Sequence, residues 1–79
     1  MHIHQIDPQS LLIGKTLADT QLRKKTGAVI VAIDRKGKNL VSPGPETVLV
    51  AGDQLFVFGE KEQIRLADEY LRLAGTTEV

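Results

Sequence analysis

One short run of the sequence restricts the fold more than any other. Residues 28–33 (AVIVAI) hold four β-branched apolar side chains in six positions: Val29, Ile30, Val31 and Ile33. β-Branched residues favour extended backbone, and successive side chains of a strand point to opposite faces of its sheet. A strand that is apolar on both faces is typical of a sheet interior. The run therefore predicts a central strand that is covered on two sides.

The remaining segments predict a mixed α/β (α+β) domain in the order β-α-β-β-(β)-β-α, a small βα sandwich. The residues after the central strand, 34–38 (DRKGK), favour a hairpin turn, and prolines at 43 and 45 interrupt the next strand. We expect one domain over residues 1–75 and a flexible tail over residues 76–79. The predicted strands are 1–6, 28–33, 39–41, a brief 47–50 and 54–58, and the predicted helices are 17–25 and 60–74.

The last predicted helix has an unusually wide apolar face. At 100° per residue its apolar side chains cover about half of the circumference, more than the roughly 100° stripe of a helix with a single core contact. We therefore expect this helix to pack on the sheet and to meet a second surface as well. One side carries Ile64, Ala67, Leu71 and Ala74, and the adjoining side carries Leu66, Tyr70 and Leu73.

The composition excludes several classes of function. Ten Lys and Arg balance ten Asp and Glu, so the chain lacks the basic excess of a nucleic-acid-binding domain, and we expect no nucleic-acid partner. No Cys is present, which excludes disulfides, thiolate catalysis and cysteine metal sites and fits a cytoplasmic location. No apolar run has the length of a membrane span, so we expect no direct membrane insertion.

Two short motifs suggest chemistry without completing it. The sequence Gly14-Lys15-Thr16 resembles the end of a phosphate-binding loop, but Gln9 stands where that motif needs its first glycine. His2 and His4 would share one face of a strand and form a metal pair, yet no third ligand is evident, and solvent-facing histidines are the simpler interpretation. No nucleophile and base stand at suggestive spacing, so we predict no enzyme activity.

Three consecutive cations, Arg23, Lys24 and Lys25, precede the central strand. Cations in the last turn of a helix interact favourably with the helix dipole, which explains them without any ligand. Helical geometry also spreads the three side chains by about 100° per residue, so at least one should point toward the main chain of Gly27 and Ala28. A guanidinium beside free strand-start amides would bind an anion or a phosphate. From spacing alone, both interpretations of the three cations stay open: a helix end that suits the dipole, or an anion site.

Four motifs in the same order resemble the TrkA C-terminal domain, which is the C-lobe of regulator of potassium conductance (RCK) proteins. The resemblance extends roughly over residues 3–73. The four motifs are SLLIGKTL at 10–17, LRKKTGAVIVAI at 22–33, PGPETVL at 43–49 and AGDQLFVFG at 51–59.

The resemblance implies a function and a set of site residues. Domains of this family form homodimers and act as cytosolic gating modules of potassium channels, antiporters and related carriers, and several bind cyclic di-AMP at the dimer interface. Carried over to this sequence, Arg23 would pair with a phosphate, Ala28, Val29 and Ile30 would flank adenine, and Pro45 would close on the base. With the resemblance, we expect Arg23 alone to bind the phosphate and Lys24 and Lys25 to be an ordinary helix end.

The resemblance also implies that the chain acts at the inner face of the membrane through a channel or antiporter partner. Cyclic di-AMP would be its regulatory ligand, and no resident cofactor is expected. Two alternatives remain. One is an assembly module that dimerises without a small ligand, and the other is a metal-responsive module that uses His2 and His4.

Overall fold

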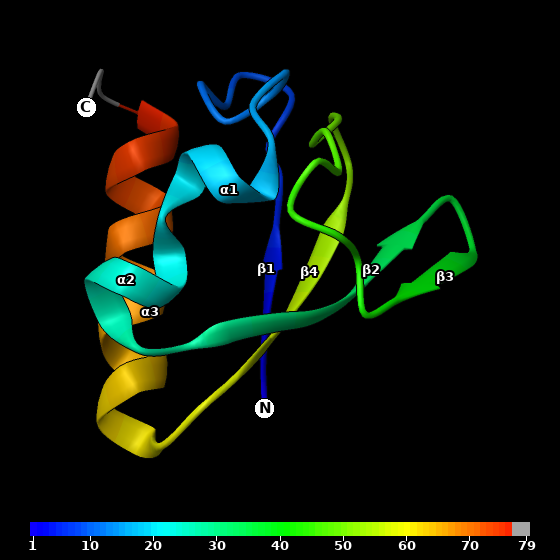
Figure 1. Cartoon of the computed structure of the whole chain (residues 1–79). Helices are drawn as coiled ribbons and strands as arrows, with labels where there is room; N and C mark the ends of the chain where they lie inside the picture. The colour runs from blue at the N-terminus through cyan, green and yellow to red at the C-terminus, as the bar shows by residue number, and fades with distance from the viewer. Residues whose placement is uncertain (77–79) are drawn as a thin grey trace.

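A computed structural model of the chain, described here for residues 1–76, contains a four-stranded sheet with its helices on one side (Figure 1). The strand order is β1-β4-β2-β3, and every neighbouring pair is antiparallel. Within residues 1–76, no helix combines the length and the apolar character needed to cross a membrane. The elements are β1 (His2–Gln5), α1 (Leu17–Thr20), α2 (Leu22–Thr26), β2 (Val29–Arg35), β3 (Lys38–Val41), β4 (Gln54–Phe58) and α3 (Lys61–Thr76).

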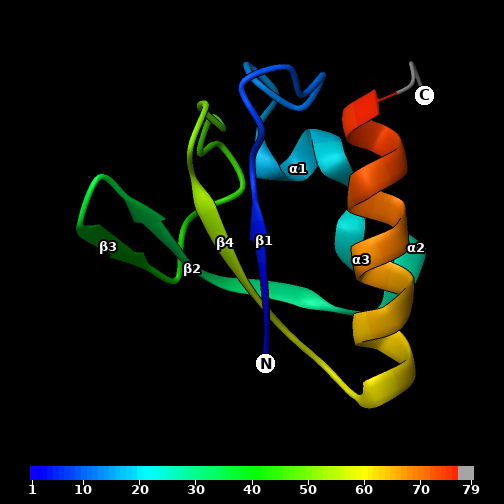
Figure 2. The same cartoon turned by 180° about the vertical axis from the view of Figure 1, so that it is seen from behind.

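The first face of the sheet meets the helices and forms the core. Paired residues of antiparallel strands share a face, so the register places His4, Leu55, Ile33 and Leu40 in one row across all four strands. Leu55 and Ile33 are fully buried, and Leu40 packs against them. α3 covers this face by packing on β1, β4 and α2 (Figure 2). Its buried residues are Ala67, Leu71, Ala74 and Gly75.

The second face of the sheet carries apolar side chains that the helices do not cover. The next row of the register joins Ile3, Phe56, Ala32 and Val41, again one residue from each strand. Phe58 lies on the same face, two residues along β4 from Phe56. Ile3 is 51% exposed, Phe58 56% and Val41 71%. An adjoining row on the same face, Gln5, Gln54, Asp34 and Asn39, is polar, so the uncovered face is part apolar and part polar.

The element order confirms the predicted fold, and the hairpin of β2 and β3 is present. Three expectations are wrong in detail. β2 is interior in the sheet, but residues 29–32 are only half-buried because one of its faces lacks a covering layer. Residues 47–50 form no strand. Val48 makes an isolated bridge with Thr16, and the main-chain hydrogen bonds around it join this segment to residues 14–17 and not to the sheet. The single helix expected over 17–25 is two helices.

The last helix begins one residue later than predicted and extends to Thr76, the first residue of the predicted tail. Residues 77–79 of that tail lie outside the described part of the chain. The wide apolar face of this helix is only partly buried: Leu66 is 37% exposed and Ile64 is half-buried. A second surface for this helix stays a prediction.

A buried ion pair fixes the loop between β3 and β4. The Asp53 carboxylate is fully buried and accepts hydrogen bonds from Arg35 Nε at 2.8 Å and from an Arg35 terminal nitrogen at 2.9 Å. It also accepts one from the Val50 N–H at 3.0 Å, and the same Arg35 nitrogen donates to the Val48 carbonyl at 2.8 Å. Arg35 was expected in a turn, but it is the last residue of β2 and holds the loop through the Asp53 carboxylate and the Val48 carbonyl.

Candidate functional site

An open groove of about 780 Å³ lies between α1, α2, the start of β2 and the loop after β3. All five residues that the sequence analysis singled out as a site line this one groove. They are Arg23, Ala28, Val29, Ile30 and Pro45. The remaining lining residues are Leu17, Ala18, Thr20, Gln21, Leu22, Lys24 and Pro43.

The wall formed by α1 and α2 owes its shape to a helix break at Gln21. Thr16 caps α1 by accepting a hydrogen bond from the Asp19 N–H at 3.1 Å, while the Asp19 carboxylate accepts one from the Thr16 N–H, also at 3.1 Å. Gln21 then adopts a left-handed conformation with φ of 53°, which ends α1 and starts α2 in a new direction. Thr20 bonds across the break, donating to the Leu17 carbonyl and accepting from the Leu22 N–H.

The proline-containing rim is attached to the start of α1 by main-chain hydrogen bonds. The Ala18 N–H donates to the Pro45 carbonyl at 3.0 Å, and the Leu17 N–H donates to the Thr47 carbonyl at 3.0 Å. These bonds hold Pro45 over the groove. They also occupy two of the amides that the start of α1 would otherwise offer to an anion.

The positive charge of the groove comes from side chains and not from strand-start amides. Arg23 and Lys24 are exposed and both line the groove, whereas the exposed Lys25 does not. The amides expected beside Arg23 are already bonded, since Gly27 N–H donates to the Arg23 carbonyl at 2.8 Å and Ala28 N–H donates to Thr26 Oγ1 at 3.1 Å. The expectation of free amides is therefore wrong, and Lys24 joins Arg23 as a candidate anion ligand.

The apolar part of the groove comes from the first residues of β2. Gly27 ends α2 with a φ of 83°, a conformation that glycine adopts without steric cost, and the chain enters β2 at once. Ala28 is fully buried beneath the groove, and Val29 and Ile30 are half-buried. β3 pairs with β2 only from Ala32 onward, so the N-terminal part of β2, which lines the groove, has no β3 residue paired with it.

The two histidines lie under α3 and do not face solvent, contrary to expectation. Both are half-buried, because the face of β1 that carries them is the face on which α3 packs. His2 Nε2 lies 3.0 Å from Asp68 Oδ1 of α3. Burial lowers the pKa of the His4 imidazole, although the Asp68 charge acts in the opposite direction. The sequence gives no sign of Asp68, because its position beside β1 depends on how α3 docks.

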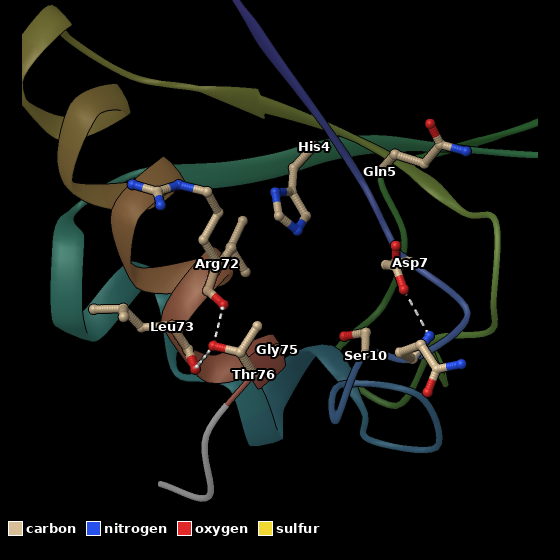
Figure 3. Close-up of a pocket in the computed structure, with 10 residues that line it drawn as sticks. His4, Gln5, Asp7, Ser10, Arg72, Leu73, Gly75 and Thr76 are labelled. Carbon is tan, nitrogen blue, oxygen red and sulfur yellow. Dashed lines mark hydrogen bonds between the residues drawn. The ribbon is translucent and has the colours of Figure 1, made fainter.

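His4 also borders a second, smaller cavity of about 320 Å³ between β1, the loop that follows it and the end of α3. Figure 3 shows the His4 ring pointing from β1 toward α3, on the side where the Arg72 side chain extends. Ser10 and Gly75 lie at the opposite side of this cavity (Figure 3). No residue singled out for the ligand site lines it.

Comparison with known proteins gives a family match and a set of related chains. Residues 1–72 match the family described as TrkA-C domain. Potassium channel protein 1 of Methanocaldococcus jannaschii is 42% identical over 60 residues, which are 76% of this chain and 18% of the channel protein. The chain therefore spans about a fifth of the length of the potassium channel relatives that it matches.

Two solved structures with similar folds contain a cyclic dinucleotide. The RCK_C domain dimer of S. agalactiae BusR in complex with c-di-AMP is 33% identical, with a TM-score of 0.78, and the match covers 91% of this chain and 95% of that one. The RCK C domain of the potassium transport protein KtrA, also in complex with c-di-AMP, is 25% identical, with a TM-score of 0.73. That match covers 85% of this chain and 79% of the KtrA chain.

Proposed function

Because this chain belongs to the TrkA-C domain family, we propose that it is a non-enzymatic regulatory domain of a potassium or related cation transport system. It dimerises, binds cyclic di-AMP in the groove beside α2, and thereby biases an attached gate. The parent or partner transporter is a membrane channel or antiporter, and the domain works at its cytoplasmic face. The observation that carries the proposal is that one groove gathers Arg23, Ala28, Val29, Ile30 and Pro45.

The chemistry of the groove suits a cyclic dinucleotide. Its adenines need flat apolar walls, which Val29, Ile30 and the Pro45 rim supply, and its two phosphates need cations. Arg23 and Lys24 bring two positive charges per chain to the same groove. A ligand with two equal halves also fits a two-fold dimer, because each chain then contributes the same half-site. The BusR and KtrA domains, which have this fold, were solved with c-di-AMP.

Dimerisation is supported by the sheet face that the helices leave uncovered. The row of Ile3, Phe56, Ala32 and Val41 crosses all four strands, and neighbouring Phe58 adds a large exposed ring. Exposed apolar patches of this kind mark association surfaces on small proteins. Val29 pairs with Phe58 across the sheet and also lines the groove. A dimer that uses this face would therefore reach the groove edge.

Calorimetry of the purified chain with cyclic di-AMP tests the ligand. We expect saturable heat with one dinucleotide per dimer. Arg23→Ala should weaken binding by about tenfold to a hundredfold, the scale of a hydrogen bond to a charged group. Lys25→Ala is the matched control, because Lys25 belongs to the same helix and is exposed but does not line the groove.

The same titration separates the ligand-binding domain from a ligand-free assembly module. Equal affinities for the Arg23→Ala and Lys25→Ala variants would show that Arg23 does not bind a phosphate of the ligand, and the phosphate site would lie elsewhere. A folded dimer that gives no heat at high micromolar ligand would reject cyclic di-AMP altogether. The uncovered sheet face would then carry the function alone, as an assembly surface.

A further inference from the structure

Three potential metal ligands converge between β1 and α3, away from the dinucleotide groove. His2 and His4 stand two residues apart on the helix-facing side of β1, and Asp68 lies opposite them on α3. One ligand atom from each side chain lies within 4.8 Å of the other two. Two secondary structure elements far apart in the sequence thus bring two imidazoles and one carboxylate together.

The contact between His2 and Asp68 lacks a well-aligned hydrogen bond. His2 Nε2 is 3.0 Å from Asp68 Oδ1, yet this atom is buried and no hydrogen-bond partner is found for it within residues 1–76. A buried polar atom without a partner is unusual in a folded protein. Two ligand atoms this close, with no aligned hydrogen bond between them, can serve as neighbouring ligands of one cation.

We propose that His2, His4 and Asp68 bind a divalent transition metal ion of the Zn²⁺ class. Zn²⁺ takes His nitrogen and Asp oxygen at about 2.0 to 2.2 Å, so neighbouring ligands of a tetrahedral site are about 3.3 Å apart. The His2–Asp68 edge already has nearly that length. No separation would have to shorten by more than about 1.5 Å, which side-chain rotation can supply.

The donor set selects the class of ion. Two imidazoles and one carboxylate suit Zn²⁺, Co²⁺ or Ni²⁺, whereas Mg²⁺ and Ca²⁺ prefer oxygen ligands alone. Three protein ligands leave one tetrahedral position for water or another donor. His4 also lines the cavity of Figure 3, which gives the site a route to solvent.

Arg72 acts against the metal and supplies a distinctive test. Its Nε lies 3.4 Å from Asp68 Oδ2, so it competes for the carboxylate and places a positive charge beside the site. Removing that charge should strengthen metal binding. If the three residues were only a packing contact between β1 and α3, the same change would have no effect on metal.

The experiment is a titration of the untagged 79-residue chain with ZnCl₂ by calorimetry, and with CoCl₂ by visible absorption. We expect one Zn²⁺ per chain, the intense visible bands of tetrahedral Co²⁺, and a rise in melting temperature of at least about 5 °C at saturating Zn²⁺. Asp68→Asn and His4→Ala should each lower affinity at least about tenfold, since loss of even outer partners costs that much.

Glu69→Gln, which removes an exposed carboxylate next to Asp68 on α3, should leave Zn²⁺ affinity unchanged, and Arg72→Gln should raise it. Circular dichroism confirms that each variant is folded. Affinity that survives Asp68→Asn would show that this carboxylate is not a ligand and would overturn the proposal. So would the absence of Zn²⁺ binding at 100-fold excess over about 10 µM folded protein.

Discussion

Substitution of the buried Asp53 carboxylate tests how the loop between β3 and β4 is held. Asp53→Asn keeps the size of the side chain and removes its charge. One carboxylate oxygen accepts from Arg35 Nε, and the other accepts from both Arg35 and the Val50 N–H. An amide can accept on one side only, so its NH₂ must face at least one of these donors. The variant thus leaves a buried donor and the Arg35 charge without their partner.

The cost follows from burial. Removal of one member of a buried ion pair costs about 3 to 5 kcal/mol. Arg35 is 31% exposed and regains some hydration when the pair is broken, so the expected cost falls below that range, to about 2 to 4 kcal/mol. A chain of 79 residues has a total unfolding free energy of about 4 to 12 kcal/mol. The substitution should therefore remove a large share of the stability.

Urea unfolding followed by circular dichroism measures this loss. For a small domain the free energy falls by about 1 kcal/mol per molar urea, so the midpoint should drop by about 2 M or more. Glu62→Gln is the matched control. Arg65 donates to Glu62 through Nε at 2.9 Å and through a terminal nitrogen at 2.6 Å, with the same chemistry but with both side chains exposed. Its midpoint should match that of the wild type, because water screens surface pairs.

The two variants together decide whether burial is the cause. If the midpoint shift of Asp53→Asn equals that of Glu62→Gln, the reasoning from burial is refuted. A large shift in both would also refute it, because the exposed pair would then contribute as much as the buried one. Only a large shift confined to Asp53→Asn supports the assigned role.

The same carboxylate should give the wild-type chain an acid-dependent stability. Burial alone would raise the pKa of Asp53, but the hydrogen bonds from Arg35 and Val50 outweigh burial and hold its pKa below the ordinary value. The native state therefore binds this proton less readily than the unfolded state does. Stability from Asp53 is present above about pH 4 and is lost as the pH falls through the lower folded-state pKa. The difference between wild type and Asp53→Asn should shrink below pH 4 in urea titrations.

Two further substitutions test the surfaces around the groove. Tyr70→Phe removes the hydroxyl that donates to the Thr20 carbonyl at 2.7 Å. The unfolding free energy, measured by urea titration, should fall by about 1 kcal/mol. No change would mean that the contact from α3 does not stabilise the helix break between α1 and α2. Phe58→Glu places a charge on the uncovered sheet face and should shift sedimentation toward monomer, whereas Leu11→Glu, at an exposed apolar residue of the loop after β1, should not. Equal sedimentation of the two variants would exclude that face as the interface.

The fold was predictable where local sequence determines the backbone. The apolar run at 28–33, the hairpin turn after it and the periodicity of the last helix each depend on neighbouring residues, and the structure contains all three elements. The break at Gln21 was not predictable. Gln has no preference for φ of 53°, and the conformation is held by Thr20 hydrogen bonds on both sides and by Tyr70 from α3. Helices cover only one face of β2, and this was not predictable either, because the sequence of one strand does not determine what packs on each face of its sheet.

The groove was predictable in part for the same reason. Arg23 and residues 28–30 belong to one short segment that passes from α2 through Gly27 into β2, so any chain with that order brings them together. Pro45 comes from another loop and reaches the groove through the hydrogen bond between the Ala18 N–H and the Pro45 carbonyl. The predicted ligand roles of Pro45 and of residues 28–30 came only from the resemblance to a known family. Lys24, predicted to be part of an ordinary helix end, also lines the groove, and dipole arguments do not distinguish among the cations of a last helical turn.

The histidine pair shows where sequence reasoning stops and the docking of elements takes over. Alternation along a strand predicts that His2 and His4 share a face, and it does so without knowledge of the fold. Whether that face meets water or a helix depends on which side of the sheet α3 covers. α3 packs on the face that also carries the fully buried Leu55 and Ile33. The same packing that builds the core therefore brings Asp68 to the histidines, and a two-ligand motif becomes a three-ligand cluster through tertiary structure alone.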